Sequence, residues 1–66
     1  MTIIANGKQR DIADGVDLAT FLGQLGLKPD RLVVEHNGAA VHRDRFASTT
    51  LHAGDRLEIA QMVGGG

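Results

Sequence analysis

The last three residues of the sequence, Gly64, Gly65 and Gly66, are the first candidates for chemistry, because they follow a segment with the alternating pattern of a β-strand. A terminal α-carboxylate is inert until an enzyme activates it, and such an enzyme must admit the last few residues into a narrow channel that leads to ATP. Glycine lacks a Cβ, so the walls of an enzyme channel can approach its backbone closely. We therefore expect Gly66 to be the modified residue, with Gly64 and Gly65 threading it into partner active sites. The alternative is an ordinary frayed terminus.

Other reactive side chains do not assemble into a known kind of site. The three histidines, His36, His42 and His52, lack the close spacing that places two metal ligands side by side, and no carboxylate completes a set with them. The hydroxyl cluster at residues 48–50 has neither a buried acid nor an oxyanion arrangement beside it, and is typical of a loop. We predict no catalytic residue, no metal site and no bound cofactor, and hence a protein that is not an enzyme.

Composition sets further bounds. The chain has 66 residues, which is one small domain, and it has no cysteine and therefore no disulfide or thiolate site. Its net charge of -1 comes from interleaved acidic and basic residues, without the basic stripe that nucleic acid requires. No apolar run approaches the ~20 residues of a membrane span. We expect a soluble cytoplasmic monomer that binds neither nucleic acid nor membrane.

Turn signals divide the chain into short elements. Asn6-Gly7 and Asn37-Gly38 each separate two short candidate strands, and Asn-Gly is the dipeptide typical of two-residue type I′ hairpin turns. A third turn, at residues 53–55, precedes a last strand. Phe46 is the one large apolar residue in the polar segment "HRDRFAST", and is expected to anchor a short helical turn.

One helix is expected between the two hairpins. Apolar residues recur at the i, i+3, i+4, i+7 spacing of a single helical face: Leu18, Phe21, Leu22 and Leu25. Asp17 is placed to cap the helix N-terminus, and Gly26 to end it. Gly23, within the helix, indicates either a close backbone approach or a tolerated defect.

The order ββ, α, ββ, short turn, β predicts an α+β fold. One helix with one apolar stripe must pack against a sheet, so we expect a β-grasp, or ubiquitin-like, fold with a mixed sheet of four or five strands. The first and last strands are expected to be parallel neighbours at the centre of this sheet. The predicted domain spans residues 1–63, followed by a flexible glycine tail at residues 64–66.

Strand parity assigns the two faces of the sheet. The residues expected to face the helix are Ile3, Ala5, Leu32, Val34, His36, Leu57 and Ile59, and those expected to face outward are Ile4, Glu58, Ala60 and Met62. We expect a surface for partner proteins on the outward side, formed by Ala60 and Met62, with Val63 at the root of the tail and Ile4 beside them across the sheet.

Five segments together resemble one known family over the whole chain. They are the hairpin "IANGK", the helix "LATFLGQLGL", the block "VVEHNGAAVHRDRF", the segment "LHAGDRLEIAQMV" and the final "GGG". This combination is similar to the thiamine-pathway sulfur carrier proteins. The resemblance implies that Gly66 is adenylated by an E1-like adenylyltransferase with ATP and magnesium. It also implies conversion to a thiocarboxylate with sulfur drawn from cysteine through a desulfurase, and sulfur donation to thiazole synthase.

Two alternatives remain at this stage. The small subunit of molybdopterin synthase shares the fold and the diglycine end, but is usually longer and begins with an aromatic-rich strand that "MTIIANGKQRDI" lacks. A ubiquitin-like modifier, or a simple interaction domain, would use the same fold without carrying sulfur. Co-purification with thiazole synthase, and not with the large subunit of molybdopterin synthase, separates the first alternative. Mass spectrometry separates the second, because thiocarboxylation replaces one oxygen by sulfur whereas conjugation produces larger adducts.

Overall fold

The structure is a computed structural model, and it describes residues 1–62. Eight elements follow one another: β1 (Thr2–Ala5), β2 (Lys8–Asp11), α1 (Leu18–Gln24), the 3-10 helix η1 (Pro29–Arg31), β3 (Leu32–His36), β4 (Ala39–Val41), the 3-10 helix η2 (Arg43–Ser48) and β5 (Arg56–Gln61). The predicted order of elements is confirmed. Within the described residues, none of the helices has the length and apolar character needed to cross a lipid bilayer.

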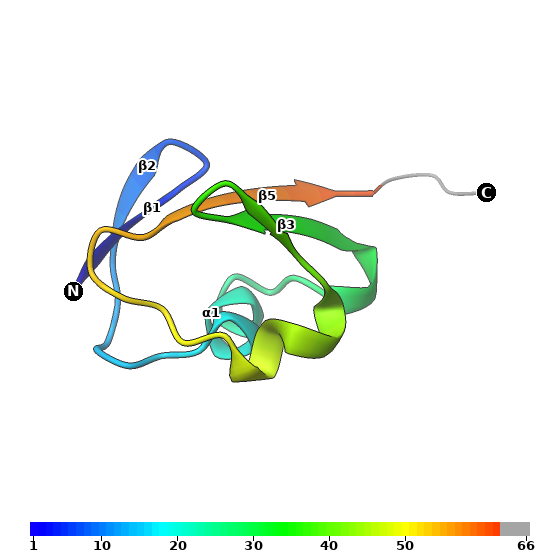
Figure 1. Ribbon diagram of the computed structural model, residues 1–66, viewed down its shortest axis with the longest axis horizontal. Coiled ribbons are helices and arrows are strands. Elements are labelled where there is room, and N and C mark those ends of the chain that lie inside the picture. The colour runs from blue at the N-terminus through cyan, green and yellow to red at the C-terminus, as the bar shows by residue number, and fades with distance from the viewer. Residues whose placement is uncertain (63–66) are drawn as a thin grey trace.

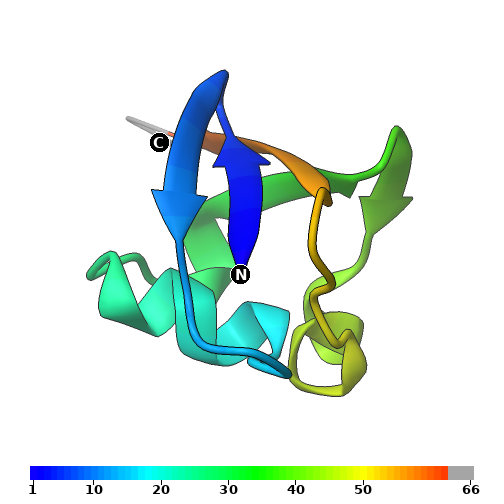
Figure 2. The ribbon, with the colours of Figure 1, turned by 90° about the vertical axis from the view of Figure 1, so that its left-hand side faces the viewer.

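The five strands form one mixed sheet in the order β2-β1-β5-β3-β4. The central pair, β1 and β5, is parallel, and the other pairs are antiparallel. Figures 1 and 2 show the sheet curving over α1, with η2 beside the helix on the same side. This is the β-grasp fold that the sequence predicts, with five strands.

Both hairpin turns have the backbone that Asn-Gly favours. Asn6 and Gly7 have φ angles of 51° and 79°, and Asn37 and Gly38 have φ angles of 52° and 86°. Positive φ at both central residues is the requirement of a type I′ turn, whose twist matches that of the flanking strands. Each turn therefore fixes the register of its hairpin.

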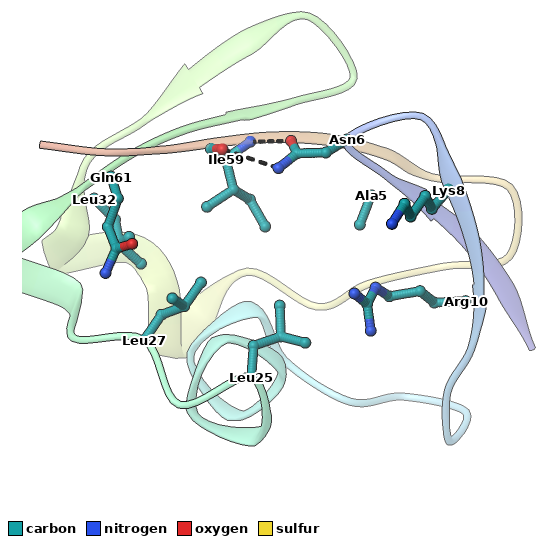
Figure 3. A pocket seen from close by; sticks show the side chains of 9 residues that line it. All are labelled: Ala5, Asn6, Lys8, Arg10, Leu25, Leu27, Leu32, Ile59 and Gln61. Atoms are coloured by element: carbon teal, nitrogen blue, oxygen red, sulfur yellow. Dashed lines mark hydrogen bonds between the residues drawn. The ribbon is translucent and has the colours of Figure 1, made fainter.

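The Asn6 side chain also extends the pairing between the two central strands (Figure 3). The Ile59 amide donates to Asn6 Oδ1 over 2.7 Å, and Asn6 Nδ2 donates to the Ile59 carbonyl over 3.0 Å. The backbone of β1 turns away after Ala5, so this amide takes the place of the next residue of the ladder. The C-terminal half of β5 is thus held on the β1 side by one side chain.

The helix begins at its predicted cap. Asp17 Oδ1 accepts a 2.7 Å hydrogen bond from the Thr20 amide, and Oδ2 accepts a 2.9 Å hydrogen bond from the Thr20 hydroxyl. These two hydrogen bonds lower the pKa of the Asp17 carboxyl. Gly23 is exposed, and a Cβ built on it would have no heavy atom within 4 Å. The helix therefore tolerates this glycine, and the alternative of a close backbone approach is wrong.

The core lies between α1 and the concave face of the sheet. Its buried members are Ile3, Ala5, Leu18, Phe21, Leu22, Leu32, Val34, Phe46, Leu51 and Leu57. The inward assignments made from strand parity are confirmed, with Ile59 partly buried against this cluster. Phe46 closes the core from η2, as the sequence predicts.

Candidate functional site

The outer face of the sheet, turned away from α1, carries the predicted partner residues nearest the end of the described chain. Ala60 lies on β5 directly opposite Val33 of β3. Val33 is 51% exposed and Met62 is 54% exposed, and these two are the large apolar side chains most open to solvent among residues 1–62. Val33, Ala60 and Met62 are called the apolar outer patch below.

Val33 was not among the predicted partner residues. The signal for it was present, because Leu32 and Val34 face inward and the residue between them must face outward. Its position beside Ala60, however, depends on the register between β3 and β5, and no local pattern in the sequence specifies that register.

Two acidic side chains border the apolar outer patch. Glu35 of β3 pairs directly with Glu58 of β5, one step along the outer face from Val33 and Ala60. A shallow hollow of about 220 Å³ lies over these four residues and Ile59. Like charges placed directly opposite each other in a sheet repel. Neither glutamate belongs to an ion pair formed within residues 1–62, so this face combines exposed apolar surface with negative charge.

Met62 is tied to the sheet at the point where β5 has ended. Its amide donates a 2.8 Å hydrogen bond to the carbonyl of Arg31, the last residue of η1. Its side chain lines a hollow of about 470 Å³ together with residues of η1, β3, β4 and η2. The position of Met62 relative to the outer face is thus fixed by backbone pairing.

The predicted neighbourhood of Ile4 is wrong. The parallel register between β1 and β5 sets Ile4 opposite Arg56, four residues before Ala60 on β5. At about 3.3 Å per residue, this separates Ile4 from Ala60 by roughly 13 Å along the strand. The sequence predicted that β1 and β5 are neighbours, but their relative stagger places Ile4 at the far end of the outer face.

Four predicted site residues, Val63, Gly64, Gly65 and Gly66, lie outside the described residues. The predicted boundary between domain and tail falls there as well. Their roles remain predictions.

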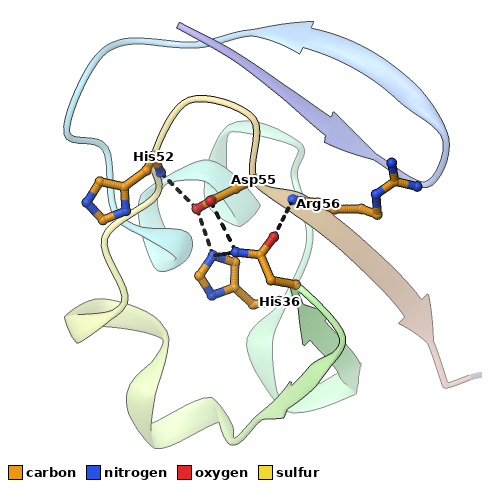
Figure 4. A network of polar contacts seen from close by, with 5 residues as sticks. His36, His52, Asp55 and Arg56 are labelled. Carbon is orange, nitrogen blue, oxygen red and sulfur yellow. Dashed lines mark hydrogen bonds and ion pairs between the residues drawn. The ribbon is translucent and has the colours of Figure 1, made fainter.

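The main polar cluster of the molecule centres on Asp55, which is only 7% exposed (Figure 4). Its carboxylate accepts hydrogen bonds from the His52 amide at 2.8 Å and from Asn37 Nδ2 at 3.2 Å, and its Oδ2 lies 2.7 Å from His36 Nε2. Burial raises the pKa of this carboxyl, but the hydrogen bonds from His36, His52 and Asn37 together outweigh burial and hold the pKa below its usual value.

This cluster has the properties of a structural brace. Asn37 Oδ1 accepts from the Arg56 amide at 2.8 Å, so the cluster joins the β3–β4 turn to the turn before β5. Each buried side-chain nitrogen or oxygen atom of the described residues has a hydrogen-bond partner. Residues 1–62 also contain no group of three acidic, histidine or cysteine side chains placed to hold a metal ion. The brace includes no hydroxyl or thiol nucleophile.

Comparison with known families gives one match over nearly the whole chain. A model described as the ThiS family matches residues 3–66. Among solved structures, the crystal structure of the thiamine biosynthesis protein ThiS from Geobacter metallireducens superposes with a TM-score of 0.85. It is 30% identical in sequence, and the match covers 100% of both chains. The solution structure from the same organism gives a TM-score of 0.80.

Similar proteins of known sequence are of two kinds. A protein named thiazole synthase from Paramagnetospirillum magneticum is 32% identical over 66 residues, which is 100% of this chain but 20% of that protein. A second thiazole synthase, from Magnetococcus marinus, is 33% identical with the same coverage. The chain thus spans one fifth of the length of these two relatives. An uncharacterized protein, ycf40 of Pyropia yezoensis, is 32% identical and is covered over 93% of its length.

Proposed function

Because the chain belongs to the ThiS family, we propose that it is a thiamine-pathway sulfur carrier and that the α-carboxylate of Gly66 is the group that carries the sulfur. The observation that supports this most directly is the match to the family model, which runs through residue 66 and so includes the glycine end. The described part of the chain contributes a rigid domain with an exposed apolar patch near its last strand.

The proposed chemistry begins with activation of the carboxylate. An E1-like adenylyltransferase joins one Gly66 oxygen to the α-phosphorus of ATP, with magnesium, and pyrophosphate leaves. The product is an acyl adenylate, a mixed anhydride with AMP as a good leaving group. A desulfurase takes sulfur from cysteine as a persulfide, and the terminal sulfur of this persulfide displaces AMP to give an acyl disulfide. A thiol then attacks the other sulfur of that disulfide, so that the thiocarboxylate leaves and the thiol is oxidised to a disulfide. The chemistry requires no side chain of the carrier, which acts as a cosubstrate and not as an enzyme.

We propose thiazole synthase as the acceptor of the sulfur. Two proteins of that name contain a segment similar to this whole chain, within one fifth of their length. Joining two partners in one polypeptide raises their effective concentration, which is useful when one must present a reactive group to the other.

The apolar outer patch is the surface proposed to bind the activating enzyme. Val33 and Met62 are exposed, and the small residue Ala60 lies opposite Val33 and two residues before Met62, so the three form an apolar area next to Glu35 and Glu58. Apolar area rimmed by charge is typical of a protein interface. Met62 is also the described residue nearest to Gly66 in the sequence, which brings docking and chemistry to the same end of the domain.

Reconstitution tests the assignment of Gly66. The protein is incubated with its activating enzyme, ATP and magnesium, and the intact mass is followed with and without a cysteine desulfurase and cysteine. We expect an AMP adduct first, and then a product in which one oxygen is replaced by sulfur. A variant that lacks Gly65 and Gly66 should give neither product, whereas the exposed-site control Lys28→Ala should behave as the wild type.

Two results would contradict the proposal. One is adenylation of the truncated protein, which would place the reactive group elsewhere. The other is recovery from cells of the protein joined to lysines of other proteins, which is the outcome expected of a ubiquitin-like modifier.

A further inference from the structure

A cleft distinct from the two hollows described above lies on the opposite side of the sheet from the apolar outer patch. It opens between β2, the C-terminal end of α1 and β5, and has a volume of about 270 Å³ (Figure 3). The helix ends at Gln24 and leaves this part of the sheet uncovered. The cleft is therefore a consequence of a seven-residue helix packed on a larger sheet.

One part of the cleft surface is apolar, beside the polar side chains of Asn6 and Gln61. Leu25 and Leu27, which follow the helix, line one side, and Leu32 and Ile59 line the sheet side. Leu25, Leu27 and Ile59 are only partly buried, so this part of the core edge stays open to solvent. The two hydrogen bonds between Asn6 and Ile59 hold the sheet side in place. The apolar surface is preformed, which lowers the cost of binding.

The rim of the cleft is cationic. Lys8 and Arg10 are two residues apart on β2, so both side chains point to the cleft side of the sheet. The residues that line the cleft include no carboxylate. Neither Lys8 nor Arg10 belongs to any of the ion pairs formed within residues 1–62. Two positive charges that have no ion-pair partner within residues 1–62 thus lie at one partly apolar opening of a protein whose net charge is -1.

We propose that this cleft binds a peptide segment of a partner protein in which a bulky apolar side chain stands next to an aspartate or glutamate. The apolar side chain fills the space between the leucines and Ile59, and the carboxylate meets Lys8 and Arg10. The volume is below the roughly 300–1,000 Å³ usual for small-molecule pockets, and suits one or two side chains better than a cofactor. β2 is also an end strand of the sheet, and a peptide can lie along such an edge.

This binding mode is independent of the proposed sulfur chemistry. The cleft lies on the helix side, and the apolar outer patch lies on the other face, so a peptide in the cleft would leave the outer patch free. A partner could thereby hold the carrier while the activating enzyme uses the opposite face.

Selection from a displayed library of random peptides tests the proposal with the full-length protein as bait. We expect enrichment of sequences that join a large apolar residue to an acidic one. The best peptide should shift the NMR amide signals of Lys8, Arg10 and Leu27 more than those of Val33 and Glu58. Its affinity should fall about tenfold when Arg10→Glu reverses one rim charge. The matched control Arg45→Glu, on η2 and outside the cleft, should bind as the wild type.

Several outcomes would overturn the proposal. They are the absence of any enriched peptide, enrichment of peptides without carboxylates, and signal shifts confined to the outer face. The amide spectrum of Arg10→Glu first confirms that this variant is folded. If it then binds the peptide as tightly as the wild type does, the rim charges do not contribute to binding. Phenylbutyrate is the small-molecule probe: if it binds the cleft as tightly as the selected peptide, the site is one for small amphipathic carboxylates and the peptide proposal is wrong.

Discussion

His36 Nε2 lies 2.7 Å from Asp55 Oδ2, and this contact joins the end of β3 to the turn before β5. A carboxylate can only accept, so His36 donates through Nε2. The His52 amide and Asn37 Nδ2 donate to the same carboxylate. One aspartate therefore aligns two loops that are 18 residues apart in the sequence, and its ionised form is the one that all three donors favour.

The first prediction concerns pH. The pKa of Asp55 is held below its usual value in the folded state, whereas the unfolded chain has the ordinary value of about 3.9. The stability that the ionised carboxylate contributes is therefore complete above about pH 4, and is lost as the pH falls through the lower folded pKa. Replacing Asp55→Asn should lower the free energy of unfolding by about 2 kcal/mol at neutral pH. Urea denaturation at several pH values measures this.

The test is the difference in the free energy of unfolding between wild type and Asp55→Asn at each pH. The gap in stability between wild type and Asp55→Asn should close at acid pH, since protonated Asp55 is then neutral too. Asp30→Asn, at an exposed position of η1, is the matched control and should show no such convergence. A gap that stays constant from neutral to acid pH would mean that Asp55 acts through its shape and not through its charge.

The second prediction concerns two glycines with opposite roles. Gly23 is exposed within α1 and has open space where a Cβ would be, so Gly23→Ala should raise the free energy of unfolding by about 1 kcal/mol. Gly7 also has open space, but its φ of 79° disfavours any Cβ, so Gly7→Ala should lower stability. Thermal unfolding of both variants is the measurement. A stabilised Gly7→Ala protein would contradict the assignment of the turn.

The parts of the fold that the sequence predicts come mainly from signals within a few neighbouring residues. Asn6-Gly7 and Asn37-Gly38 specify their turns through positive φ, and the helical spacing from Leu18 to Leu25 specifies one buried face. These signals act over a few residues, and each is confirmed. The parallel pairing of β1 with β5 follows from chain order and crossover length, and is confirmed too.

The features that the sequence did not predict all depend on register between distant strands. The stagger of β1 against β5 moves Ile4 away from Ala60, and the register of β3 against β5 brings Val33 beside it. His36 was expected at a partly buried edge, but its contact with Asp55 requires two turns to meet in space. Side-chain parity gives the face of a residue, whereas only the assembled sheet gives its neighbours.

The third prediction tests the apolar outer patch. Replacing Met62 or Val33 with alanine should lower the affinity for the activating enzyme by about tenfold, because exposed apolar anchors contribute most at the centre of an interface. Ile4→Ala is the matched control on the same face, about four residues away along the neighbouring strand. Titration calorimetry should give Ile4→Ala an affinity for the activating enzyme close to that of the wild type. Equal losses for all three variants would extend the interface over the whole outer face.

The fourth prediction concerns Gly65. A leucine at this position should impair adenylation about 5- to 150-fold, because a side chain that meets a close-packed channel wall costs about 1–3 kcal/mol. Among residues 1–62, the buried core consists of residues between Ile3 and Leu57, so we expect the melting temperature to stay the same. ATP-pyrophosphate exchange and thermal unfolding are measured on the same samples. Unchanged exchange would exclude the channel, and a large drop in melting temperature would show that Gly65 is packed in the folded domain.

The last prediction uses the repulsion between Glu35 and Glu58. These residues face each other on β3 and β5, next to Val33 and Ala60, so Glu58→Lys replaces a like-charge pair with an opposite-charge pair. The change should raise the free energy of unfolding by a few tenths of a kcal/mol, as cross-strand charge pairs do. It should also weaken the complex with the activating enzyme, most strongly at low salt, if that enzyme presents basic side chains to this acidic border.

The double variant Glu35→Lys/Glu58→Lys restores repulsion with the opposite sign, so it should lose the gain in stability and bind still more weakly. Unfolding and binding are measured at low and high salt for all three proteins. A Glu58→Lys protein that is more stable and binds equally well would show that the acidic pair lies outside the interface.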